Sequence, residues 1–291
     1  MEEETAGQKG AGGAKTASPA AAIVEITYYT DPLCCWSWAF EPQWRRLRYQ
    51  YAGRIRWRYR MGGLIAGWEG YDDPINAVSR PAQMGPLWKE AQHVSGMPIE
   101  ARIWMEDAPS SSYPSCLAVK AAERQSAEAG ERTLRRLGDA VMREGRNIAR
   151  RAVIDAVAGE LARAAPEHFD AGRFREDWDS PAVRDAFRSD LKEARYREIG
   201  RFPTLTLQQV GTPGGVVIVG YRPYEALEEA LRQVAPDVEP VRAVPDVETY
   251  AAFWGGVTDR ELAELGEGAP KGPARVARRR SDNEQTRDRH P

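Results

Sequence analysis

Cysteine and histidine are scarce in this sequence. Its 291 residues include three of each. Three cysteines are too few, and odd in number, for a secreted domain held together by disulfides. The histidines, His93, His168 and His290, are scattered, and no two of them have the spacing of metal ligands. We therefore predict no metal site.

The sequence also lacks long apolar runs and a strong excess of either charge. No apolar run approaches the length of a membrane span, which argues against a membrane partner. The formal net charge of −2 argues against nucleic acid as the main partner. Residues 1–21 are polar and lack the charged start and apolar run of a secretory signal. Together these features predict a cytoplasmic protein whose thiols stay reduced.

Residues 22–68 carry the pattern of a strand, a turn, a helix and a second strand. Residues 23–29 are β-branched and aromatic, which predicts a strand. Residues 36–51 predict one helix, kinked at Pro42, and residues 55–60 predict the second strand. The opening is therefore a βαβ unit.

Four arginines alternate along this second strand: Arg54, Arg56, Arg58 and Arg60. Alternation is typical of a half-buried strand, so we interpret them as a solvated or partner-facing strand face and not as a nucleic-acid site. Glu25, on the first strand, is an acid that would tune a nearby thiol if it pointed inward. Alternation does not settle its direction.

Residues 69–198 form a helical segment between two β-rich parts. A stretch of turns and short helices punctuated by prolines comes first, and alanine, leucine, arginine and glutamate then predict longer helices. These helices are expected at about 115–129, 131–144, 150–164 and 181–198.

The β pattern resumes in residues 199–235, with strands at 204–207 and 216–219 and a closing helix at 224–234. The order βαβ, helical insertion, ββα predicts an α/β protein with a thioredoxin-like fold and a large all-helical insertion. The remaining parts are predicted as a disordered leader at 1–21, a short helical appendage at 236–265 and a disordered tail at 266–291.

Cys34 follows a strand and a turn and opens a helix. A helix N-terminus offers free backbone N–H groups and a partial positive charge, which both favour a thiolate. We therefore expect a lowered pKa for Cys34, and a thiolate is the species that attacks disulfides. A buried, inert cysteine is the alternative.

A second element of the candidate site is Phe202-Pro203-Thr204, just before a strand. A proline there cannot donate to the sheet, and in the thioredoxin order the preceding residue faces the start of the active-site helix. If the Phe202–Pro203 bond is cis, the backbone of Phe202 can bond an extended substrate beside Cys34. An ordinary proline at a strand entry is the alternative.

The segment Asp31-Pro32-Leu33-Cys34-Cys35-Trp36-Ser37-Trp38 resembles the active-site segment of the cytoplasmic DsbA-like oxidoreductases, a family that includes FrnE-like proteins and a protease-adaptor, YjbH-like branch. The resemblance covers about 22–235 and implies that Cys34 is the nucleophile. We assign Trp36, Phe202, Pro203 and Thr204 to substrate binding. Four further stretches agree in order with the family: Gly62-Gly63-Leu64, Ser112-Tyr113-Pro114-Ser115, Arg146-Asn147-Ile148 and Phe202-Pro203-Thr204-Leu205.

The family's second cysteine falls on Ser37, which gives Cys-x-x-Ser. A serine cannot resolve a mixed disulfide, so the usual dithiol cycle cannot run on this motif. Cys35 and Cys116 are the candidate resolving thiols. A bridge between the adjacent Cys34 and Cys35 is strained, and Cys116 fits a core cysteine better.

Three functions remain open. In the first, Cys34 is the thiol of a monothiol thiol-disulfide oxidoreductase, with glutathione or a protein thiol as co-substrate and no bound cofactor. In the second, the protein resembles the kappa-class glutathione transferases and hydroxychromene carboxylate isomerases, which use a serine at the Cys34 position. In the third, it is a non-catalytic binding protein, like the branch of the family that delivers a transcription factor to a protease.

Overall fold

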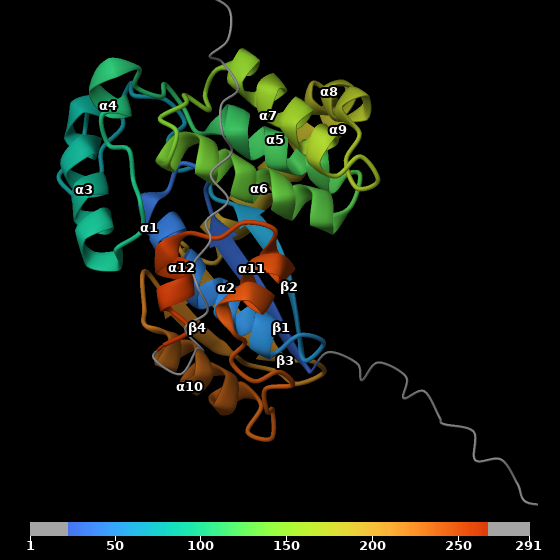
Figure 1. The fold of residues 1–291 in the computed structure, drawn as a ribbon. Helices are drawn as coiled ribbons and strands as arrows, with labels where there is room; N and C mark the ends of the chain where they lie inside the picture. Colours follow the sequence, from blue (N-terminus) through green and yellow to red (C-terminus); the bar gives the residue numbers. More distant parts are fainter. Residues whose placement is uncertain (1–22, 267–291) are drawn as a thin grey trace, which may run out of the picture.

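The computed structural model describes residues 23–266. The predicted leader at 1–21 lies outside the described residues, as does the predicted tail at 266–291 apart from its first residue. Figure 1 shows a twisted sheet with helices on both sides, and a group of further helices above it.

The sheet has four strands in the order β2-β1-β3-β4. β1 pairs in parallel with β2 and antiparallel with β3, and β3 pairs antiparallel with β4. This is the thioredoxin-type order predicted from the sequence, and the structure confirms it. The elements of this part are β1 (Val24–Thr30), α1 (Cys35–Ala39), α2 (Glu41–Gln50), β2 (Ile55–Met61), β3 (Thr204–Gln209), β4 (Val216–Val219) and α10 (Tyr224–Val234).

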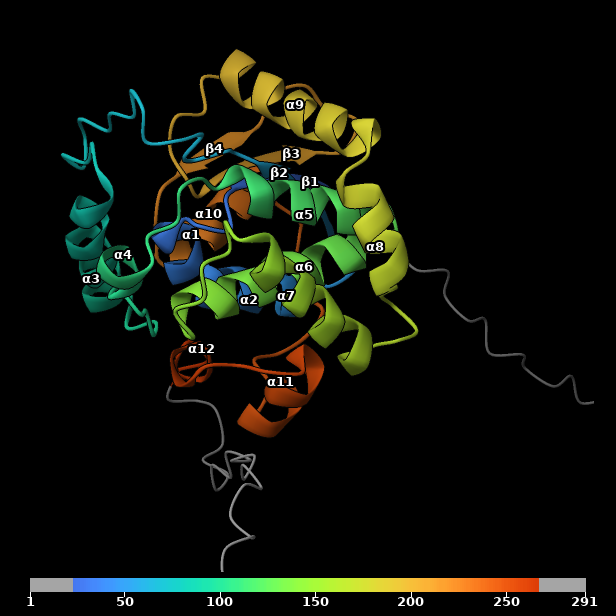
Figure 2. The same cartoon turned by 90° about the horizontal axis from the view of Figure 1, so that it is seen from above.

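The helical insertion lies between β2 and β3. Figure 2 shows its main group from above, where α5 packs against α6, α8 and α9. A short 3-10 turn, Pro81–Gln83, precedes the first helix. The helices are α3 (Met84–Ser95), α4 (Ile103–Glu106), α5 (Tyr113–Glu123), α6 (Ala127–Met142), α7 (Arg151–Ala164), α8 (Ala171–Trp178) and α9 (Pro181–Tyr196).

The predicted single helix over residues 36–51 is two helices in the structure. α1 ends at Ala39 and α2 begins at Glu41, with Phe40 as the residue between them. Pro42 therefore stands in the first turn of α2, where its missing N–H has no partner to lose. The helix is therefore interrupted before the proline, and no kinked helix runs through it.

Two further boundaries differ from the predictions. The helix expected over 115–129 ends at Glu123, and α6 begins after Ser126, whose hydroxyl oxygen accepts the N–H of Ala129 as an N-cap. α8 was not predicted, although Asp170 caps its start by accepting the N–H groups of Gly172 and Arg173. Serine and aspartate are common N-cap residues, but helix-forming residues on either side of Ser126 and Asp170 hid these two helix starts in the sequence.

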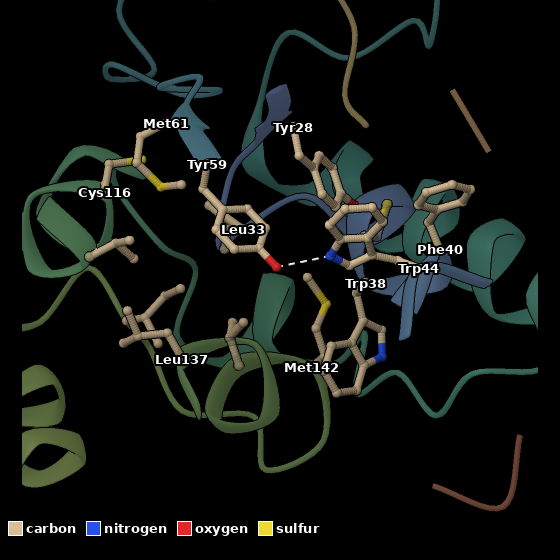
Figure 3. Packing of buried hydrophobic residues seen from close by; sticks show 14 of the residues in the cluster. Tyr28, Leu33, Trp38, Phe40, Trp44, Tyr59, Met61, Cys116, Leu137 and Met142 are labelled. Atoms are coloured by element: carbon tan, nitrogen blue, oxygen red, sulfur yellow. Dashed lines mark hydrogen bonds between the residues drawn. The ribbon is translucent and has the colours of Figure 1, made fainter. Parts of the chain in front are cut away.

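Aromatic side chains fill the space between the sheet and α2. Trp44 is fully buried, and its indole Nε1 donates to the Tyr59 hydroxyl at 2.9 Å (Figure 3). Its ring meets the ring of Tyr28 edge-on, with 5.3 Å between centroids. This packing fixes α2 against β1 and β2, and α2 follows directly on the helix that Cys34 opens.

The segment after residue 236 contains α11 (Val247–Trp254) and α12 (Asp259–Ala263). It is tied to the core by the fully buried carboxylate of Glu261. That carboxylate pairs with Arg45 of α2 at 3.1 Å and with Arg135 of α6 at 2.8 Å. The segment is therefore held by buried ion pairs and is more than a surface attachment.

Replacing the buried carboxylate of Glu261 tests this attachment. Glu261→Gln removes the negative charge that faces Arg45 and Arg135, and a buried charge that loses its partner is strongly destabilising. We expect the free energy of unfolding, measured in urea, to fall by about 3 kcal/mol. Glu248→Gln, an exposed change on α11, is the matched control. Equal effects of the two changes would contradict the role of Glu261.

Candidate active site

The sulfur of Cys34 lies between two segments that are far apart in the sequence. Cys34 is the N-cap of α1, and its Sγ accepts the N–H of Ser37 at 3.4 Å. On its other side, the thiol donates to the carbonyl oxygen of Phe202 at 3.5 Å. The Phe202–Pro203 peptide bond is cis. The structure thus brings the start of α1 and the chain that enters β3 to one sulfur atom.

Cys34 lines a groove of about 720 Å³. One wall carries Trp36 and Tyr221, whose rings have centroids 6.1 Å apart. Phe202 lines another part, and Trp88 of α3 contributes from the insertion. Only 5% of Cys34 is exposed, and besides this groove it lines a second, much smaller cavity beside Trp38 and Leu134.

The buried carboxylate of Asp31 connects the active-site turn to two other segments. It accepts the N–H of Leu33 at 2.9 Å and that of Leu64 at 2.7 Å. The hydroxyl of Ser112, at the start of α5, donates to it at 2.8 Å. Burial raises the pKa of Asp31, and these hydrogen bonds oppose the rise. The motifs at 62–64 and 112–115 therefore meet the Asp31 turn in space.

The other two cysteines are buried and differ in position. Cys35 is 3% exposed and lines the groove next to Cys34. Cys116 is fully buried in the cluster drawn in Figure 3, and its thiol donates to the carboxylate of Asp31 at 3.2 Å. No disulfide joins the three cysteines, which are all free.

Of the residues assigned to substrate binding, Trp36 and Phe202 line the groove, whereas Pro203 and Thr204 do not. Thr204 is 1% exposed, and its hydroxyl donates to the carbonyl of Arg201 at 2.7 Å. Its side chain thus fixes the turn before β3 instead of facing the groove. Glu25 also points away from the thiol, since it pairs with Arg56 at the surface.

Burial raises the pKa of Cys34 to about 11, so the expected lowering was wrong. Removing the thiolate from water costs more than the side chain and backbone of Ser37 return, and the nearby carboxylate of Asp31 adds repulsion. At pH 7, on the order of one Cys34 in ten thousand is a thiolate. The sequence revealed the helix start but not the depth at which the sulfur is buried.

Ser37 stands where a second thiol would be expected. It is 5% exposed, and its Oγ is buried and makes no hydrogen bond within residues 23–266. Its N–H donates to the Cys34 sulfur at 3.4 Å. Among the described residues, no group of three or more His, Cys, Asp or Glu side chains is arranged to hold a metal ion, and no helix is long and apolar enough to cross a membrane.

A βαβ–ββα sheet with a helical insertion, and a cysteine at a helix start facing a cis-proline turn, define a DsbA-like thioredoxin-fold protein. Comparison with known families agrees. The family model described as thioredoxin matches residues 28–229, so this chain belongs to that family.

Individual relatives extend this result. The chain is 27% identical over 242 residues to the ClpXP adapter protein SpxH of Halalkalibacterium halodurans, covering 82% of this chain and 77% of the relative. Cytosolic disulfide reductase DsbM from Pseudomonas aeruginosa is a structural neighbour with a TM-score of 0.52, 20% identity and coverage of 79% and 97%. A 2-hydroxychromene-2-carboxylate isomerase has a TM-score of 0.53, 15% identity and coverage of 74% and 100%. At such identities, these structures show a common fold.

The burial of the three thiols predicts their order of reactivity. Because the pKa of Cys34 is about 11, its rate of alkylation by iodoacetamide should keep rising, about tenfold per pH unit, from pH 7 to pH 10. Burial also raises the pKa of Cys35 and Cys116 well above its ordinary value, and both are less exposed than Cys34, so both should react more slowly. Peptide mass spectrometry of the folded protein measures all three rates. A plateau for Cys34 below pH 8, or faster alkylation of either other thiol, would contradict this.

Asp31→Asn tests the carboxylate that joins the segments around the site. The amide keeps one acceptor oxygen but presents an NH2 group to donors such as Ser112 and Leu64. Since buried donors that lose a charged acceptor are costly, the free energy of unfolding should fall by about 3 kcal/mol. The exposed change Asp237→Asn is the control. Unchanged stability of Asp31→Asn in urea would show that the convergence on Asp31 is not structural support.

Proposed function

We propose that this protein is a thiol-disulfide oxidoreductase that works through a single thiol and forms mixed disulfides at Cys34. The observation that supports this most strongly is the position of the Cys34 sulfur, between the N–H of Ser37 and the carbonyl of Phe202, at a groove large enough for a peptide. An extended substrate beside Phe202 would bring its own sulfur to Cys34. Trp36 and Tyr221 offer it an apolar wall.

The first half of the proposed reaction forms the mixed disulfide. The Cys34 thiolate attacks one sulfur of a substrate disulfide, and the bond between the two substrate sulfurs breaks. The departing sulfur leaves as a thiolate with the electron pair and takes a proton from water. The Ser37 N–H lies where it stabilises the thiolate before attack and again when Cys34 is released.

The second half requires an outside thiol, because Ser37 cannot form a disulfide. We propose glutathione as the co-substrate. A glutathione thiolate attacks the Cys34 sulfur, releases the remaining substrate thiolate and leaves Cys34 joined to glutathione. A second glutathione thiolate attacks that glutathione sulfur, frees Cys34 and departs as glutathione disulfide. One substrate disulfide is reduced, and two glutathione thiols are oxidised.

The proposed setting is a reducing, cytoplasmic one. The support is that the three cysteines are free, although Cys34 and Cys35 are adjacent and both line the groove. A protein or peptide with a reactive sulfur is the proposed partner. We propose no resident cofactor, and neither nucleic acid nor a membrane as partner of this groove.

A second candidate function is that of a binding protein without turnover. The raised pKa of Cys34, at about 11, favours it because a thiol that is rarely ionised is a slow nucleophile. The adapter name of the relative from Halalkalibacterium halodurans points the same way. In this function the groove holds a partner segment for delivery to a protease. The kappa-type transferase alternative requires a serine where this chain has Cys34.

Ser37→Cys tests the monothiol mechanism. Wild type should reduce a small disulfide-linked peptide slowly, at a rate that rises with glutathione concentration. Ser37→Cys supplies a thiol one helical turn from Cys34, so its first turnover without glutathione should release substrate at least about tenfold faster. Release of the reduced peptide, followed by chromatography, measures both rates.

Two further variants separate the outcomes. Ser189→Cys adds a thiol at an exposed position of α9 and should leave the rate unchanged. If wild type releases substrate quickly without glutathione, Cys35 or Cys116 resolves the mixed disulfide and the monothiol mechanism is wrong. If no variant exchanges disulfides and Cys34→Ser binds a partner as wild type does, the binding-protein function is supported.

A further inference from the structure

A second groove, of about 950 Å³, follows the outer edge of the sheet. β2 is an edge strand, and each of residues 55–60 lines this groove. Because neighbouring side chains of a strand point to opposite faces, a groove lined by consecutive residues must run along the strand edge. α2, α6 and the end of α11 with the loop after it supply the other walls, and no residue that lines the Cys34 groove contributes.

The backbone of β2 is open along this edge. Gly62 donates inward to Thr30, whereas the N–H of Met61 points outward to the Asp190 carboxylate at 3.0 Å. By the same alternation, the N–H and C=O groups of Trp57 and Tyr59 also point outward. Neither residue has a backbone hydrogen bond on that side to any residue within 23–266. The edge therefore presents a row of unused donors and acceptors.

Arginines outnumber acids among the residues that line the groove. Three of the lining residues also carry a buried donor atom without a hydrogen-bond partner among the described residues: Arg48 Nε, Arg136 Nη1 and Trp254 Nε1. At the rim, Arg56 pairs with Glu25 and Arg58 lies 3.9 Å from Glu193, but the two arginine side chains remain 59% and 58% exposed. Each guanidinium has five N–H donors, more than one carboxylate can use. An occupant with carboxylate or carbonyl oxygens suits the N–H donors that these two exposed arginines keep.

The four acids of the groove are already paired with cations. Glu123 pairs with Lys120, Glu128 with Arg132, Glu131 with Arg48, and Asp139 with Arg135. They leave the groove an arginine-rich lining without an unpaired carboxylate. They also disfavour a polyanion that approaches every wall, such as nucleic acid, because phosphates would meet these carboxylates.

We propose that this groove, the β2-edge groove, binds an extended acidic peptide segment of a partner protein, which adds to the sheet as a strand beside β2. Its backbone would pair with the outward groups of Trp57 and Tyr59, and its carboxylates would meet Arg56 and Arg58. A phosphate chain offers acceptors only, whereas a strand edge needs donors and acceptors in alternation. Roughly five residues of peptide span the open edge.

Binding of defined peptides by fluorescence anisotropy tests the proposal. The probe is a fluorescein-labelled seven-residue peptide of alternating glutamate and valine. A lysine–valine peptide and a glutamate–valine peptide N-methylated at alternate backbone amides should both bind at least about tenfold more weakly, since each removes one feature of the proposed contact. The Cys34→Ser variant should bind the acidic peptide as wild type does, because this groove does not use Cys34.

Variants and hydrogen exchange locate the peptide. Arg56→Glu/Arg58→Glu should weaken binding about tenfold, whereas Arg184→Glu/Arg188→Glu, exposed on α9 and outside the groove, should not. In wild type, the peptide should protect the amides of Trp57 and Tyr59 from exchange. Equal binding of the N-methylated peptide, a single-stranded oligonucleotide that binds more tightly than the acidic peptide, or unprotected amides at β2 would each overturn the proposal.

Discussion

The buried carboxylate of Asp31 is the contact on which the geometry of the Cys34 site depends. Donors from the turn before α1, from the loop after β2 and from the start of α5 all reach it. A fully buried carboxylate is tolerated only when hydrogen-bond donors satisfy its oxygen atoms, as they do here. It fixes the thioredoxin-like part and the helical insertion relative to each other where they meet, and the turn that holds Cys34 is one of the segments it fixes.

In this arrangement, two opposing effects act on the ionisation of the Cys34 thiol. The start of α1 supplies a backbone N–H to the sulfur, which favours the thiolate, while burial and the charge of Asp31 disfavour it. Burial wins, so Cys34 rests as a thiol that donates to Phe202. A partner that enters the groove replaces this contact with its own groups. The reactivity of Cys34 is therefore expected to depend on the partner, which suits slow exchange or retention better than rapid turnover.

The order of strands along the chain and the helical insertion could be predicted from the sequence. The spacing of hydrophobic residues and the composition both change sharply where the β-rich parts meet the insertion. The arginines of β2 were correctly placed on an alternating strand face. Three features needed the structure. The break at Phe40 depends on local turn geometry, the depth of Cys34 depends on side chains from distant segments, and the role of Asp31 depends on Leu64 and Ser112 meeting it. The second and third features arise from contacts between residues far apart in the chain.

Cys34 is expected to form a mixed disulfide that no other thiol of this chain resolves. Incubation of the reduced protein with glutathione disulfide, followed by intact and peptide mass spectrometry without reductant, tests it most directly. The spectra should show one glutathione per chain, on Cys34, that persists after excess reagent is removed and is absent from Cys34→Ser. A chain that loses the glutathione and carries a disulfide from Cys34 to Cys35 or Cys116 would contradict it.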